Sequence, residues 1–108
     1  MSHISAHVLD AAAGSPAAAV TVRLTDTDGV TLAESVTDDD GRVGDFGPDR
    51  LEPGVYQVVF GSGDYFAARR VESFHPEVVV RFTVAADQGH YHIPLLLSPY
   101  AYTTYRGS

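Results

Sequence analysis

The apolar side chains of this sequence recur at every second position in several short segments, which is the pattern of β-strands with one buried face. The clearest case is the segment 77–85, where Val78, Val80, Phe82 and Val84 fall on one face. Residues that favour turns separate these segments. We therefore expect strands over residues 4–10, 20–26, 30–37, 54–60 and 77–85, and a final two-stranded hairpin within 90–108 that turns at Ser98-Pro99.

One short helix is expected among these strands, over residues 62–69. Ser62 is the expected N-cap, and Asp64 lies in the first turn, where the helix dipole favours an acid. The segment 38–49 is rich in Asp and Gly and predicts a solvated turn, with a very short edge strand at Leu51. Seven ordinary strands, one very short strand and one helix indicate an all-β fold, a two-sheet β-sandwich.

The strand expected at 90–97 has two faces of different character. One face is apolar and is expected to lie in the core, whereas the other mixes imidazoles with apolar side chains. The strand 4–10 repeats this mixture, with His7 beside Leu9 on its outward face. Such a surface predicts contact with a ligand or a partner. Proline cannot donate to a ladder, so Pro94 predicts a local irregularity. The inward residues are Tyr91, Ile93, Leu95 and Leu97, and the outward ones are His90, His92, Pro94 and Leu96.

Composition narrows the class of protein. The 108 residues suit a single domain, 1–108, and the hydrophobic fraction of 44% excludes a disordered chain. The net charge of −7 argues against nucleic acid as a partner, and the lack of cysteine excludes disulfides and thiolate chemistry. The first residues show no secretory signal pattern, and no apolar run reaches the ~18 residues of a membrane span. A cytoplasmic protein with no membrane partner is expected.

Candidate chemistry lies in the histidines and one arginine. A lone His92 would most simply be a satisfied strand residue, but with His7 on a neighbouring strand the two imidazoles could exchange protons near neutral pH. Arg42 is either a solvated turn residue or a guanidinium that binds a carbonyl-rich substrate. His90, His92 and His7 could instead form a three-histidine zinc site, although a metal-free site without a cofactor is the expectation. His3 and His75 are expected at the surface.

Four segments together resemble the 5-hydroxyisourate hydrolases, the transthyretin-related enzymes of urate breakdown. The run HYHIPLLLSPY followed by YRGS at 90–108 resembles their C-terminal signature. HVLD at 7–10 resembles their N-terminal motif, and Asp40-Gly41-Arg42 their middle motif. The run from Phe74 to Phe82 resembles the stretch before their last hairpin.

This resemblance implies a transthyretin-like sandwich of eight strands with one short helix after the fifth, in which the first and seventh strands are adjacent. It implies hydrolysis of the cyclic amide 5-hydroxyisourate to 2-oxo-4-hydroxy-4-carboxy-5-ureidoimidazoline, with water as the nucleophile and no cofactor. It also implies a homotetramer, a dimer of dimers, with the sites between dimers.

The resemblance also implies roles for individual residues. His7, Arg42, His92 and Ser108 would be catalytic, and the same four would bind substrate together with Tyr105 and Arg106. Ser108 would hydrogen-bond to a histidine and orient it, because no nucleophile-elbow pattern accompanies it. The plain alternative for Ser108 is a frayed terminus.

Two other classes of function compete with the enzyme. One is a non-catalytic carrier of small ligands like transthyretin, which the resemblance implies would lack the paired histidines and the YRGS ending. The other is a β-sandwich interaction module, which explains the fold but neither the histidines nor the tail.

Overall fold

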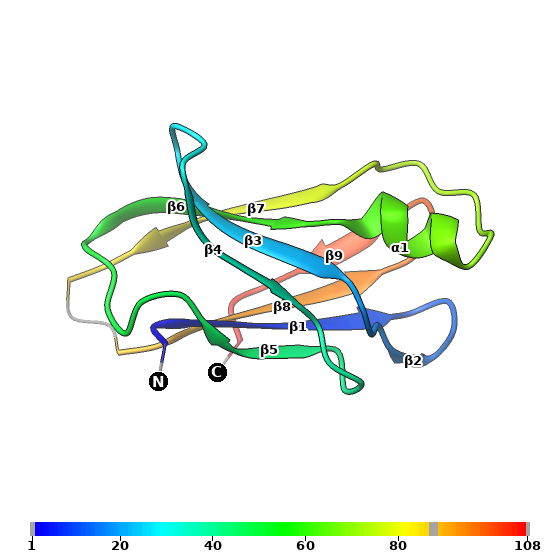
Figure 1. The fold of residues 1–108 in the computed structure, drawn as a ribbon, viewed down its shortest axis with the longest axis horizontal. Coiled ribbons are helices and arrows are strands. Elements are labelled where there is room, and N and C mark those ends of the chain that lie inside the picture. The colour runs from blue at the N-terminus through cyan, green and yellow to red at the C-terminus, as the bar shows by residue number, and fades with distance from the viewer. Residues whose placement is uncertain (1, 87–88, 108) are drawn as a thin grey trace.

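A computed structural model describes residues 2–86 and 89–107 and shows two β-sheets packed face to face, with one short helix at one end (Figure 1). This arrangement confirms the predicted sandwich, although the described residues form nine strands rather than eight, and the helix follows the sixth strand rather than the fifth. The first sheet contains β1 (Ile4–Asp10), β2 (Ser15–Pro16), β5 (Arg42–Phe46), β8 (Tyr91–Leu97) and β9 (Tyr102–Thr104). The second contains β3 (Thr21–Asp26), β4 (Thr31–Val36), β6 (Gly54–Phe60) and β7 (Val78–Val84), and helix α1 (Ser62–Ala68) follows β6.

Strands β1 and β8 are parallel neighbours at the centre of the first sheet. Their register runs without a shift from Ile4 opposite Tyr91 to Asp10 opposite Leu97. β9 pairs with the other edge of β8, and β5 and β2 pair with successive parts of the other edge of β1. The two ends of the sequence are therefore side by side, as the resemblance implied for the first and the penultimate strands.

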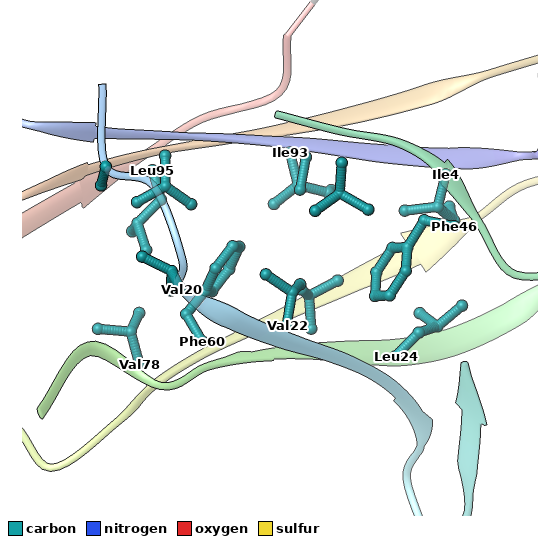
Figure 2. Close-up of a cluster of buried hydrophobic side chains, with 14 of the residues drawn as sticks. Ile4, Val20, Val22, Leu24, Phe46, Phe60, Val78, Ile93 and Leu95 are labelled. Carbon is teal, nitrogen blue, oxygen red and sulfur yellow. The ribbon is translucent and has the colours of Figure 1, made fainter. Parts of the chain in front are cut away.

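The core lies between the two sheets and is filled by alternate residues of their strands. In Figure 2, Ile4 and Leu95 of the first sheet point towards Val22 and Phe60 of the second. All four side chains are at most 2% exposed. Full burial of one such side chain stabilises the fold by about 1.5–3 kcal/mol, so this alternation is the main source of the sandwich's stability.

The segment 38–49 contains a strand that the sequence pattern did not predict. The structure has β5 at Arg42–Phe46, whereas Leu51, where an edge strand was expected, is a buried residue outside any strand. Val43 and Phe46 both point inward although they are three residues apart, which breaks the two-residue alternation. A β-bulge opposite Ile4 and Ala6 absorbs the extra residue, and this hides the strand in the sequence.

Helix α1 occupies the expected segment but begins differently. Its N-cap is Gly61, which provides no side-chain hydrogen bond, and Ser62 is the first helical residue rather than the cap. A side chain at position 61 would clash with Thr21, because a Cβ there would lie 2.2 Å from its Oγ1. Asp64 lies in the first turn, as predicted. No helix in the ranges 2–86 and 89–107 is long and apolar enough to cross a membrane.

A buried hydrogen bond ties the helix to the first sheet. The hydroxyl of Tyr65 donates to Oδ2 of Asp10 at 2.8 Å, while Oδ1 of Asp10 accepts the N–H groups of Ala12 and Ala13. Burial, followed by this hydrogen bond, raises the pKa of Tyr65 to about 12. The carboxylate at the end of β1 therefore has partners on both oxygens, as a buried acid requires.

Pro94 lies where the ladder between β8 and the C-terminal segment is interrupted. The β8–β9 pairing ends at Leu95 opposite Thr104 and resumes in the same register as an isolated bridge between His92 and Gly107. The interruption in the ladder therefore falls at Pro94, a residue that has no N–H to donate. This is the local irregularity that the sequence predicted.

We expect the substitution Gly41→Ala to destabilise the fold more than Gly29→Ala. Both glycines have positive φ, +75° and +85°, so alanine costs each about 1–2 kcal/mol. A Cβ at Gly29 meets nothing within 4 Å, whereas at Gly41 it lies 2.2 Å from the carbonyl oxygen of Val8. Urea denaturation should therefore show a loss at Gly41 that is larger by at least about 1 kcal/mol. Equal losses would mean that the contact with Val8 is easily relieved.

Candidate active site

The two histidines singled out from the sequence lie next to each other on the outer face of the first sheet. His7 is on β1 and His92 on β8, and both are partly buried. Their ring centres are 6.4 Å apart, with ring planes inclined by 36°. Because β1 and β8 are adjacent, two imidazoles that are 85 positions apart in the chain can act on one molecule.

Ser5, which the sequence reasoning missed, connects His92 with a third histidine. It lies directly opposite His92 in the β1–β8 register. Its Oγ is 2.8 Å from Nδ1 of His92 and 2.9 Å from Nε2 of His90. The available signal was its position two residues before His7, on the same outward face of the strand. Serine is too common in strands for that spacing alone to mark it.

The Asp/Gly turn before β5 fixes the other histidine. Oδ1 of Asp38 accepts the N–H groups of Asp40 and Arg42, and this holds the turn in shape. The carbonyl oxygen of Asp40 lies 3.0 Å from Nε2 of His7. A carbonyl can only accept, so Nε2 carries a hydrogen, and a neutral His7 has its lone pair on Nδ1.

Arg42 opens β5 and lies opposite His7 in the β1–β5 register. It is a strand residue rather than a turn residue, and its exposed side chain lines the same hollow as His90 and His92. Arg42 and His92 line one hollow of about 340 Å³. Ser5, Gly44 and His90 also line it. The hollow thus joins one guanidinium to two imidazoles and a hydroxyl, a set suited to a small polar ligand.

The surroundings of His92 favour its neutral form. Burial, and after it the positive charges that His7, Arg42 and His90 can carry, lower the pKa of His92 below its usual value of 6.5. A neutral imidazole can accept a proton, so His92 is suited to act as a base at neutral pH.

The C-terminal tail reaches His92 from the other side. The N–H of Gly107 donates to the carbonyl oxygen of His92 at 2.9 Å, and a Cβ at Gly107 would lie 2.5 Å from Cδ2 of the ring. The guanidinium of Arg106 stacks on Tyr91, 4.5 Å from the ring centre. Ser108, the expected partner of a histidine, lies outside the described residues.

Tyr105 and Arg106 are not brought to the hollow of His92. They line a second hollow, between β7 and the end of the tail, which Phe82 and Ile93 also border. In the described chain, Tyr105 is exposed, and Arg106 contacts the core-facing Tyr91.

The remaining histidines differ from each other. His3 was expected at the surface, but it is 4% exposed, and its Nδ1 accepts the N–H of Leu51 at 2.9 Å. The surface prediction for His3 was wrong because apolar alternation does not identify a buried histidine. Its hydrogen-bond partner, the backbone of Leu51, is distant in the sequence. His75 is partly buried between the rings of Phe74 and Tyr102. Over residues 2–86 and 89–107, no three His, Cys, Asp or Glu side chains are grouped as metal ligands.

Comparison with known proteins gives consistent matches over the whole chain. The family model described as HIUase/Transthyretin family matches residues 4–107. A 5-hydroxyisourate hydrolase of Pseudomonas aeruginosa is 43% identical, and the match covers 100% of this chain and 93% of that protein. The solved 5-hydroxyisourate hydrolase of Klebsiella pneumoniae has a TM-score of 0.90 at 38% identity, covering 100% of this chain and 94% of that one.

The same fold also occurs in a protein with a different name. Sea bream transthyretin, solved in complex with thyroxine, has a TM-score of 0.90 at 31% identity, covering 97% of this chain and 94% of that one. The backbone is therefore equally similar to both proteins, and only side chains at the site can distinguish their functions.

We expect the imidazole of His92 to titrate with a midpoint below 6.5 when its ring resonances are followed by NMR. Arg42→Gln should raise this midpoint, because removing a nearby positive charge makes protonation of His92 less unfavourable. Arg81→Gln removes the same charge from the outer face of the second sheet and should leave the midpoint unchanged. An equal response to both substitutions would show that Arg42 has no specific effect.

Proposed function

The chain belongs to the HIUase/transthyretin family, and we propose that it is a 5-hydroxyisourate hydrolase of urate degradation. The observation that carries this proposal is the close approach of His7 and His92 beside Arg42 and the tail residue Gly107. The reaction would open a cyclic amide with water and release 2-oxo-4-hydroxy-4-carboxy-5-ureidoimidazoline. The named relatives support the choice of substrate.

We propose that His92 is the general base. Its lowered pKa keeps it neutral at neutral pH, and with Nδ1 engaged by Ser5, its Nε2 is the nitrogen left to take a proton from water. The resulting hydroxide adds to the amide carbonyl carbon, and Arg42 offsets the negative charge that develops on the carbonyl oxygen. His7, held by Asp40, positions the water or protonates the departing ring nitrogen. Acid–base help of this kind typically contributes about 10²–10⁴ in rate.

The tail has a supporting part in this proposal. The contact of Gly107 with His92 supports a role for the next residue, Ser108, whose hydroxyl would orient an imidazole. Arg106 and Tyr105 would contribute to substrate binding through the position of the tail, since Arg106 is held on Tyr91.

A non-catalytic carrier is the second candidate, because transthyretin shares the fold. The paired histidines, the guanidinium opposite His7 and the YRGS ending favour the enzyme, because a carrier needs no proton acceptor with a lowered pKa.

We also propose that the protein assembles as a homotetramer, a dimer of dimers. The outer face of the first sheet carries the partly buried Leu9 and Leu96 beside the histidines, and a small domain rarely leaves such a surface to water. In the described chain, β7 and β9 are edge strands that both border the second hollow, and a second copy could pair with these edges.

The proposed activity predicts that the protein accelerates the decay of freshly made 5-hydroxyisourate, followed by its ultraviolet absorbance. We expect His7→Asn and His92→Asn each to lower kcat by about 100-fold, as loss of an acid or base does. His75→Asn is the matched control and should keep its activity, because His75 contacts Phe74 and Tyr102 rather than the site. Decay no faster than in buffer with the unaltered protein would favour the carrier, and full activity in either site variant would remove that histidine from the mechanism.

The proposed assembly predicts the mass of a tetramer in light scattering at micromolar concentration. Leu96→Glu should reduce that mass, because it places a charge on the outer face of the first sheet. A monomeric mass for the unaltered protein would contradict the proposal.

A further inference from the structure

A continuous chain of hydrogen-bonding groups leads from His92 to solvent. Nδ1 of His92 is 2.8 Å from Oγ of Ser5, and the same oxygen is 2.9 Å from Nε2 of His90. His92 and Ser5 are partly buried, whereas His90 is exposed. We propose that Ser5 and His90 form a relay that carries a proton from His92 out of the site, an inference that rests on the proposed hydrolysis.

The hydroxyl of Ser5 has one hydrogen but contacts two ring nitrogens, so it can donate to only one of them and must accept from the other when it does. In one state Ser5 donates to His90 and accepts Nδ1–H of His92, which leaves the lone pair of His92 on Nε2. In the other state Ser5 donates to His92 and accepts Nε2–H of His90. The tautomers of the two histidines are therefore linked through a single hydroxyl.

The reaction itself requires a route of this kind. Water adds to the amide carbon, the carbon–nitrogen bond breaks, the nitrogen keeps one hydrogen of the water, and the new carboxylic acid ionises. One proton per turnover must therefore leave the site. After Nε2 of His92 has taken a proton, its Nδ1–H can pass to Ser5 while the hydroxyl hydrogen of Ser5 passes to Nε2 of His90. This moves one positive charge from His92 to His90 and leaves His92 neutral with its hydrogen on Nε2, and this hydrogen must return to Nδ1 before the next turnover.

The charges around the relay favour this direction. His7 on β1 and Arg42 on β5 are positive or can become so, and both disfavour a charge on His92, as burial does. His90 is exposed, so water stabilises its charged form, and water or buffer can take up the proton.

The experiment compares Ser5→Ala, His90→Gln and Ser5→Thr, which keeps the hydroxyl. We expect the first two to lower kcat roughly tenfold without changing KM, less than the about 100-fold cost of losing the base itself. Added imidazole buffer should restore their kcat by accepting the proton, whereas the unaltered protein and Ser5→Thr should be insensitive to it. His75→Gln is the control for the loss of a histidine and should behave like the unaltered protein.

Each outcome decides for or against the relay. Normal kcat in Ser5→Ala or His90→Gln overturns it and leaves the hydrolase intact. A loss that neither Ser5→Thr nor imidazole relieves also overturns it, because it marks a purely structural role. If the unaltered protein does not hydrolyse 5-hydroxyisourate, the proposed function fails first, and the proton exit fails with it. Nitrogen-15 shifts of His90 and His92 that do not respond to Ser5→Ala would show that the hydrogen-bonded chain does not form.

Discussion

The parallel pairing of β1 with β8 is the constraint on which the rest of the molecule depends. It joins segments from the two ends of the sequence in one unbroken register, and it places Ser5 opposite His92. A shift of this register by one residue would turn the outward side chains of β8 into the core and expose its apolar side chains to solvent. The burial of Ile93 and Leu95 therefore fixes the histidine chemistry, because the packing that holds these side chains inward also holds His92 outward.

The sequence predicted those parts of the fold that have a strong alternation. The run from Val78 to Val84 and the two faces of β8 follow directly from the two-residue period, as does the outward position of His7. β5 escaped prediction because Val43 and Phe46 are three residues apart and need a bulge to face the same way. In such a segment the partner strand, and not the local pattern, decides the structure.

The site was predictable only in part, for a similar reason. His92 and Arg42 could be singled out by residue type and resemblance, but Ser5 acquires its importance from the residue opposite it in the sheet. His3 shows the converse, since another histidine near the start of β1 is buried and accepts a backbone N–H from Leu51. Residue type indicates what a side chain can do, whereas long-range register decides which partner it meets.

The contacts on either side of His92 also bear on how the domain is made. One side of the His92 ring contacts Ser5 and the other side contacts Gly107. The surroundings of His92 therefore need residues from both ends of the sequence, which are synthesised first and last. A nascent polypeptide still emerging from the ribosome could form the β3–β4 hairpin and much of the second sheet, yet it would have no complete pocket. Chemistry therefore begins only when translation of this domain has finished, and fragments left by premature termination would be inert.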